Sequence, residues 1–368
     1  MDNNIRMSRR GVLGAAVAGV GLAATGQSYA SASTRPARTA LPSGAYRIDM
    51  HSHFLPPEYR AALVSRGMLT IGGYPLPDWG PLAAVEFQDR YGIAAQVLSV
   101  SDPGVEFLEP ADANTMARYC NAYAAELIRS QPTRFGALAV LPMHDVRAAI
   151  DELVYALDTL HLDGVVLLSA YDGVYLGDPR FEALMFELNR RKAYVFVHPA
   201  SIPAGSKPAL PLPDFLAEFT FDTTRAATLL MATGTRDRYP DIRFQLAHAG
   251  GTLPYLAHRI GVASQTPIGD GWPAQLQAPS LLGIGRLVSS YYYDTALSAA
   301  PASMKGALQV SDLSKIVFGS DWPFSTLTLL GSGDPQPELS ETFSAEERVQ
   351  IERGNALREL PGLAERIG

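Results

Sequence analysis

Residues 46–60 read YRIDMHSHFLPPEYR, an apolar run that ends in His51 and His53 and then meets two prolines. Such a run predicts a buried β-strand that stops at a turn, because proline lacks the amide hydrogen that a strand interior needs. Side chains two positions apart on a strand point to the same face, so the two imidazoles are expected side by side. The stretch predicts a strand with a pair of nitrogen ligands at its carboxyl end, although two hydrogen-bonded structural histidines remain the alternative for this motif alone.

Seven further apolar, strand-like runs follow the first, separated by segments with helical periodicity. The eight runs lie at 46–53, 93–101, 135–143, 164–170, 193–200, 242–250, 289–296 and 315–321. Continuous apolar strands that alternate with helices predict a parallel sheet covered on both faces. Eight such units in about 320 residues favour an α/β fold of the closed (β/α)8 barrel type, with loop insertions, over an open doubly wound sheet.

Aspartates stand where three of the intervening helices are expected to begin. Asp112, Asp145 and Asp178 open the helical segments 112–131, 145–160 and 178–191. An aspartate before the first helical turn accepts a hydrogen bond from a free amide of that turn, so each is expected to cap its helix.

The first 32 residues differ in composition from the rest of the chain. The paired arginines Arg9 and Arg10 precede a weakly apolar run that starts at Gly11, and small residues follow up to Ala32. This pattern predicts a twin-arginine export signal over residues 1–32. The run is short and rich in glycine for a membrane span, so an uncleaved anchor is the less favoured alternative. We expect a periplasmic or secreted protein that does not stay inserted in a membrane once the signal is removed.

The remaining chain is expected to hold a linker and one domain. Residues 33–45 are rich in proline, serine and threonine, and residues 46–365 hold the eight predicted units. Removal of residues 1–32 takes away three arginines and one aspartate, so the formal charge moves from −7 to −9. An acidic protein without a basic patch argues against binding to nucleic acid. Cys120 is the only cysteine, which excludes an intrachain disulfide, and it is expected to pack in the core.

Three more metal-binding residue types end predicted strands. His198 and His248 lie near the ends of the runs 193–200 and 242–250, and Asp321 ends 315–321. Barrel enzymes place their chemistry at the carboxyl ends of the strands, so these side chains are expected to meet the first two histidines at one rim. Imidazole and carboxylate ligands without a thiolate suit zinc or manganese.

The sequence favours a single metal ion. A binuclear barrel hydrolase needs a bridging lysine or glutamate late on the fourth strand, and GVVLLSAYDG at 164–173 has neither. Two aspartates are expected to support the ligands. Asp49 is expected on the face of its strand opposite to the histidines, as a structural or hydrogen-bond partner, and Asp294 at the end of the seventh strand could act in the same way.

Long Gly- and Pro-rich stretches and aromatic side chains are available to build a substrate pocket. The stretches 67–81, 201–214 and 264–280 are longer than simple connections and are expected to act as lids, without an indication of which ones cover the site. The aromatic candidates are Phe54, Trp79, Phe219, Phe221, Trp322 and Phe324. Arg225 could meet a carboxylate or simply pair with Asp222.

The ordered motifs resemble the amidohydrolase superfamily. They are IDMHSHFLPPEY, VFVHP, FQLAHAGGTLPYLAHRI and VFGSDWPF, and the resemblance covers about residues 46–365. Within the superfamily the chain is similar to the branch of metal-dependent, non-oxidative decarboxylases that includes aminocarboxymuconate semialdehyde decarboxylase and γ-resorcylate decarboxylase. EFTFDTTRAA at 218–227 looks most like the 6-methylsalicylate decarboxylases.

The resemblance implies roles for the candidate residues. It makes the metal ligands His51, His53, His198 and Asp321. His248 would be the proton-transfer residue near the ion, and Asp321 would count as catalytic as well as metal-binding. Zinc is the expected metal, manganese the known variant, and no other cofactor is implied. By resemblance alone, the protein is also expected to form a homodimer.

The expected reaction is decarboxylation of a small hydroxy-carboxylic acid. No arginine lies between Arg66 and Arg90, which weakens a dicarboxylic substrate and favours an aromatic monocarboxylate. Hydrolysis of a lactone, amide or ester is the alternative, because the same ligands can activate water. A non-catalytic exported binding protein is the third class, but it would not need five metal-type residues at one rim.

Overall fold

The computed structural model of the protein describes residues 40–203, 205–208, 210–263, 281–325, 331 and 333–368. The predicted export signal and most of the linker therefore lie outside the described residues, as does the third long stretch, 264–280. Within the described part, no helix is both long and apolar enough to cross a membrane.

Eight parallel strands form one sheet in the predicted order. They are β1 (Arg47–His53), β4 (Ile93–Ser99), β5 (Phe135–Ala139), β6 (Gly164–Leu168), β9 (Tyr194–His198), β10 (Arg243–Leu246), β11 (Tyr292–Asp294) and β12 (Ile316–Val317). The sheet closes where the last strand returns to the first: Met50 N donates to Phe318 O at 2.8 Å and His53 N donates to Trp322 O at 2.8 Å. The predicted (β/α)8 barrel is confirmed.

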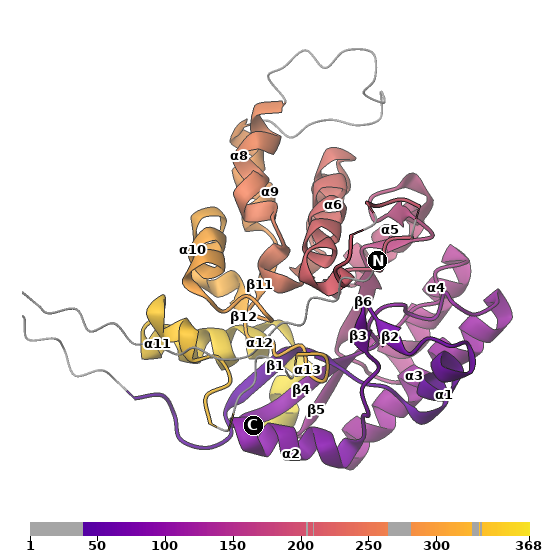
Figure 1. Ribbon diagram of the computed structural model, residues 1–368, viewed down its shortest axis with the longest axis horizontal. Coiled ribbons are helices and arrows are strands. Elements are labelled where there is room, and N and C mark those ends of the chain that lie inside the picture. Colours follow the sequence, from indigo (N-terminus) through magenta and orange to yellow (C-terminus); the bar gives the residue numbers. More distant parts are fainter. Residues whose placement is uncertain (1–39, 204, 209, 264–280, 326–330, 332) are drawn as a thin grey trace, which may run out of the picture. The chain divides into compact units, whose positions relative to one another are not determined.

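The strands are buried on both faces, as their continuous apolar composition predicts. Every residue of β1, β6 and β9 is buried. Helices lie outside the strands and cover them (Figure 1). Both faces of such a strand are buried because one packs in the barrel interior and the other against the helices.

The helices surround the strands and connect them. The α-helices are α1 (Pro57–Ser65), α2 (Pro81–Tyr91), α3 (Pro110–Ser130), α4 (Val146–Val154), α5 (Glu182–Arg190), α6 (Glu218–Ala232), α7 (Thr235–Arg238), α8 (Leu253–Ala263), α9 (Leu281–Ser289), α10 (Pro301–Val310), α11 (Ala345–Val349), α12 (Asn355–Glu359) and α13 (Pro361–Ile367). Short 3₁₀ or π segments are η1 (Tyr155–Thr159), η2 (Pro179–Phe181), η3 (Asp214–Leu216), η4 (His248–Gly250), η5 (Leu313–Lys315), η6 (Pro337–Glu341) and η7 (Gln350–Gly354).

Two of the three predicted aspartate caps are confirmed. Asp145 accepts a hydrogen bond from Arg147 N at the start of α4, and Asp178 accepts one from Arg180 N at η2. The cap at Asp112 is wrong. Helix α3 starts two residues earlier, at Pro110, whose ring suits a first helical position, and Asp112 lies inside the first turn.

An irregularity in β1 separates Asp49 from the histidines. The register with β4 shifts between Asp49 and Ser52, so strict alternation of side chains fails there. Asp49 accepts from Gln96 Nε2 at 3.3 Å, and Gln96 accepts from Gln88 Nε2 on the covering helix α2 at 3.2 Å. Asp49 therefore faces the helix layer, as predicted, while His51 faces the barrel interior.

Two small hairpins lie at the carboxyl ends of the barrel strands. One is formed by β2 (Thr70–Ile71) and β3 (Tyr74–Pro75), the other by β7 (Ala170–Tyr171) and β8 (Val174–Tyr175). The first hairpin lies within the predicted lid stretch 67–81.

Candidate metal centre

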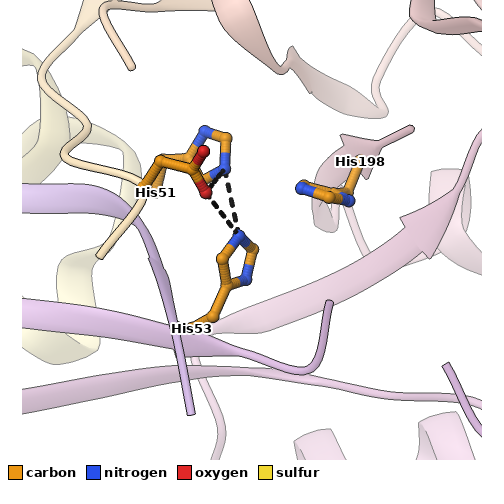
Figure 2. A group of neighbouring side chains, drawn as sticks. His51, His53 and His198 are labelled. Carbon is orange, nitrogen blue, oxygen red and sulfur yellow. Dashed lines mark hydrogen bonds and ion pairs between the residues drawn. The ribbon is translucent and has the colours of Figure 1, made fainter. Parts of the chain in front are cut away.

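Four of the predicted residues converge inside the barrel mouth. His51 and His53 come from β1, His198 ends β9, and Asp321 follows β12. One ligand atom from each lies within 4.8 Å of the ligand atoms of the other three, and all four side chains are buried. Figure 2 shows the imidazole of His198 facing those of His51 and His53 from the other side of this cluster.

The shortest distances join the nitrogen atoms of β1 to the carboxylate. His51 Nε2 lies 3.2 Å from His53 Nε2, and Asp321 Oδ1 lies 3.3 Å from the first and 3.1 Å from the second. Two nitrogen lone pairs and a carboxylate oxygen at these separations repel one another unless a positive charge lies between them. The donor set therefore fits a divalent cation.

The partner of the other ring nitrogen fixes the tautomer of His51. Its Nδ1 lies 2.9 Å from Asp294 Oδ2. The buried carboxylate can only accept, so Nδ1 carries the hydrogen and Nε2 presents its lone pair to the cluster. Asp294 is itself held by Gln245 Nε2 at 2.9 Å, so it cannot swing away.

The other two histidines are oriented by neutral acceptors. His53 Nδ1 lies 3.0 Å from Ser99 Oγ, and the hydroxyl of Ser99 donates to Ser52 O at 3.1 Å. The serine oxygen must then accept from His53 Nδ1. His198 Nδ1 lies 2.9 Å from Pro199 O, which can only accept. All three imidazoles thus turn Nε2, the nitrogen that can bind a metal ion, toward one point.

The electrostatics of the cluster favour a cation. Burial lowers the pKa of His53 and, more strongly, that of His198, which keeps both imidazoles neutral. Burial opposes ionisation of Asp321, but His51 and the other histidines around it hold the pKa of its carboxyl well below the usual range. Burial also opposes protonation of His51, yet Asp294 and Asp321 outweigh it and raise the pKa of His51 to about 10. The two carboxylates, Asp294 and Asp321, attract positive charge to the cluster, either a proton on His51 or a cation in its place, and the four residues form a site for a divalent metal.

His248 lies beside the four ligands, directly after β10. Its backbone N donates to Asp294 Oδ1 at 2.9 Å, and its Nε2 lies 3.5 Å from Asp321 Oδ2. Its Nδ1 is buried and has no hydrogen-bond partner among the described residues. His248 thus has one ring nitrogen near the ligand carboxylate and the other free to exchange a proton.

The HAGG sequence explains how the backbone places His248 at the rim of the barrel. His248 and Ala249 have φ of 56° and 55°, which turns the chain sharply after the strand. A Cβ at Gly251, where φ is 62°, would lie 2.0 Å from Thr220 O, so only glycine allows α6 to approach this turn. Left-handed backbone outside glycine is uncommon and is typical of functional sites.

The remaining histidines and Arg225 lie outside the cluster. His144 Nε2 bonds Leu108 O at 2.9 Å, and both His161 and His258 are exposed. Arg225 Nη1 lies 3.9 Å from Asp222 Oδ1, which agrees with the simple pairing that was the second interpretation. Cys120 is fully buried in the core, as expected.

A small pocket lies against the metal ligands. Its volume is about 20 Å³, and its floor is formed by His198, His248 and Asp321. Apolar and aromatic side chains form the cover, namely Ile71, Tyr74, Phe215, Phe219, Leu297 and Phe324. Among the described residues that line it, none is a lysine or arginine.

Only two of the six proposed aromatic residues reach the pocket. Phe219 and Phe324 line it, whereas Phe54 packs on Trp79, Trp322 stacks on Phe87, and Phe221 is largely exposed. Sequence reasoning missed Ile71, Tyr74, Ser101, Phe215 and Leu297. Tyr74 lies in the predicted lid 67–81 and Phe215 directly follows 201–214, so the sequence signal identified the segments but not the residues.

The two lid segments interlock over the pocket. Phe215 N donates to Gly72 O at 3.1 Å, and the rings of Tyr74 and Phe215 are 5.9 Å apart. A Cβ on Gly72 would lie 2.4 Å from the ring of Phe219, so the hairpin packs directly against α6. The hairpin and residues 215–219 therefore cover the metal site together.

Comparison with known proteins finds a match to one protein family. Residues 48–361 match the profile of the amidohydrolase family. The decarboxylase yanB of Aspergillus niger is 36% identical over 334 residues, which cover 86% of this chain and 87% of that protein. The 6-methylsalicylic acid decarboxylase of Penicillium expansum is 33% identical, with 86% and 97% of the two chains covered.

A solved structure has the same fold. The dihydroxybenzoic acid decarboxylase of Polaromonas, which holds manganese and the inhibitor 2-nitroresorcinol, is 23% identical, with a TM-score of 0.68. The match covers 86% of this chain and 97% of that one. The likeness extends over the whole barrel.

Proposed function

Because the chain belongs to the amidohydrolase family, we propose that it is a metal-dependent, non-oxidative decarboxylase of a small aromatic hydroxy-carboxylic acid. The observation that carries the proposal is a pocket with a metal site as its floor and a cover of aromatic side chains. The names of the relatives, which include 6-methylsalicylic acid decarboxylases, support the reaction and the aromatic substrate. The absence of lysine and arginine from the described pocket lining supports a substrate with one carboxylate.

The metal would be held by His51, His53, His198 and Asp321. When bound, a divalent cation supplies a Lewis acid that holds and polarises the carboxylate and a neighbouring oxygen of the substrate. We propose zinc as the metal and manganese as the alternative, since nitrogen and carboxylate ligands without thiolate suit both. A structural relative that holds manganese supports the alternative.

His248 is the proposed proton donor. In the reaction a proton is added to the ring carbon that bears the carboxylate, so a C–H bond forms there. The C–C bond to the carboxylate then breaks, its electron pair restores the aromatic ring, and CO2 leaves. No oxidant or reductant is consumed. An imidazole suits this step because its pKa lies near neutral pH, and the free Nδ1 of His248 can be recharged with a proton.

Two features of the chain prepare the site for this chemistry. Asp321 lies 3.5 Å from His248 Nε2, so it can hold the imidazolium in place and stabilise it, which is the proposed catalytic role of this ligand. Rings of the cover, Phe219 and Phe324 among them, exclude water and present an apolar wall to the substrate ring. Exclusion of water strengthens the charge interactions around the substrate.

The experiment that tests the proposal measures products directly. The purified protein is analysed for zinc and manganese and then incubated with a panel of 2-hydroxybenzoates and a panel of lactones, amides and esters. We expect CO2 and a phenol from at least one hydroxybenzoate, with loss of activity after chelation. Release of acid from a lactone, amide or ester without CO2 from any hydroxybenzoate would instead identify a hydrolase.

We further propose that residues 1–32 direct export by the twin-arginine route and that 33–45 form a linker before the enzymatic domain of 46–365. The paired arginines and the apolar run after them support this proposal. That route carries folded proteins, so a metal acquired in the cytoplasm would stay bound during transport. A homodimer is also proposed, and sedimentation of the metal-loaded protein tests it.

A further inference from the structure

Ser101 is a buried polar residue in the pocket with no partner for its side chain. It lies just past the carboxyl end of β4, it is 7% exposed, and it lines the pocket above His198, His248 and Asp321. No hydrogen bond joins its hydroxyl to any other residue that the structure describes. The hydroxyl oxygen is not among the fully buried side-chain atoms that lack a partner, so it reaches the open space of the pocket, where a bound ligand can accept a hydrogen bond from it.

The position of Ser101 just past β4 places it beside the proposed substrate site. Ser99, two residues earlier, points into the barrel and binds His53 Nδ1. Ser101 follows Ser99 by two residues, beyond the end of β4, and lines the pocket above the metal ligands. The two serines thus provide one hydroxyl that serves a metal ligand and a second that lines the pocket.

The rest of the cover offers the substrate little polarity. Ile71, Phe215, Phe219, Leu297 and Phe324 are apolar, and Tyr74 has an interaction of its own. A carboxylate has about four lone-pair sites on its two oxygens. A hydroxybenzoate with its carboxylate toward the ligand cluster would therefore need a further donor for that group, since a buried charged acceptor is costly when it is not satisfied.

We propose that the Ser101 hydroxyl donates a hydrogen bond to the carboxylate of the substrate and so selects aromatic acids over the corresponding phenols. This inference rests on the proposed function for the kind of substrate. Ser101 is then a specificity-determining residue that recognises the group that leaves as CO2. It takes no part in holding the metal.

The proposal predicts a division between binding and turnover. The carboxylate loses its charge as CO2 forms, so the hydrogen bond from Ser101 is stronger in the bound substrate than in the transition state. Removal of the hydroxyl should therefore raise KM without lowering kcat. Loss of a hydrogen bond to a charged group is expected to weaken substrate binding about tenfold or more.

Calorimetric titration of the metal-loaded protein tests the proposal without turnover. The ligands are 2-hydroxybenzoate, which has a carboxylate beside a hydroxyl, and catechol, which has two adjacent hydroxyls and no carboxylate. If the wild type releases CO2 from 2-hydroxybenzoate, the competition constants of a nonreacting carboxylate analogue and of catechol replace the titration. The variants are Ser101→Ala, Ser101→Thr, which keeps a hydroxyl, and Ser99→Ala as the matched serine two residues earlier.

We expect Ser101→Ala to keep its metal content, to bind the carboxylate ligand about tenfold more weakly and to bind catechol as the wild type does. Ser101→Thr should restore most of the preference for the carboxylate. Ser99→Ala should instead lower metal content and weaken both ligands. Equal losses for both ligands in Ser101→Ala, or no loss for either, would overturn the proposal. The wild type could bind 2-hydroxybenzoate with this dependence on Ser101 and yet release CO2 from no acid. That result would contradict the decarboxylase function but would still support recognition of the carboxylate by Ser101.

Discussion

Asp294 Oδ2 lies 2.9 Å from His51 Nδ1, although 243 positions separate the two residues in the chain. This hydrogen bond turns the other nitrogen of His51 toward the metal ligands. The second oxygen of the same carboxylate accepts from His248 N at 2.9 Å. One buried aspartate on β11 therefore positions both a metal ligand and the proposed proton donor.

Asp294→Asn should weaken metal binding. The asparagine keeps the shape of the side chain but loses the charge that raises the basicity of His51, and such partners are worth about ten- to hundredfold in metal affinity. Competition with a fluorescent chelator measures the dissociation constant. Asp163→Asn is the matched control, since Asp163 is a buried aspartate that pairs with Arg366 at 2.9 Å and lies outside the metal cluster. An Asp294→Asn protein with the metal affinity of the wild type would show that Asp294 does not tune His51.

Removal of the metal should lower the melting temperature. The four ligands come from residues 51 to 321, so only the folded chain brings them together. A ligand at one hundred times its dissociation constant stabilises the folded state by about 2.7 kcal/mol. For a domain of about 320 residues that corresponds to about 4 °C. Differential scanning calorimetry with and without chelator measures the shift, which should be absent in His198→Ala. An equal shift in that variant would mean that the chelator acts elsewhere.

His248→Asn should separate metal binding from turnover. Asparagine tolerates the left-handed backbone at this position better than alanine, so the variant removes the imidazole with little strain. We expect wild-type metal content and a loss of turnover of about 10²- to 10⁴-fold. Metal analysis and CO2 release measure the two quantities on one preparation. A fully active variant would exclude His248 as the proton donor.

Glu106 should make the protein less stable as the pH rises. Burial raises the pKa of this glutamate from 4.5 to about 7, although Met143 N and Val105 N donate to its carboxylate. A carboxyl group with a raised pKa binds more protons in the folded than in the unfolded state between these two values. Its contribution to stability is therefore present below pH 4.5 and is lost as the pH rises through about 7.

Glu106→Gln removes this titration. Relative to the wild type, the variant should gain about 3 kcal/mol of unfolding free energy between pH 4.5 and pH 8, whatever fixed cost the substitution has. Denaturant unfolding at several pH values measures the difference. A constant difference across that range would show that Glu106 titrates in the folded protein as it does in the unfolded chain.

Much of the fold was accessible from the sequence because it depends on local patterns. Each of the eight observed strands lies within its predicted run, since continuous apolar segments between helical periods have few other interpretations. The errors are also local. Asp112 looked like a helix cap because aspartate favours that position, but Pro110 starts the helix one half-turn earlier.

The pocket was much less accessible. The stretch 67–81 was identified as a lid, yet nothing in its composition distinguishes Tyr74, which lines the pocket, from Trp79, which packs on Phe54. Ser101 could have been found by its place at the end of the predicted run 93–101, because the metal ligands also lie at the carboxyl ends of strands. The contact of Gly72 with Phe219 joins segments almost 150 residues apart, and neither segment has a sequence pattern that predicts it.

The amino-acid order determined the barrel and the candidate residues at its rim, because chain direction places residues 51, 53, 198, 248 and 321 at the same end of a parallel sheet. The resemblance to a known family then distinguished the four metal ligands from His248. The tertiary structure alone decided which nitrogen each histidine presents and what covers the metal site. Those features depend on hydrogen bonds and van der Waals contacts between distant segments, such as His51 with Asp294 and Gly72 with Phe219. Such contacts exist only after the barrel has closed, and no local pattern of side chains encodes them.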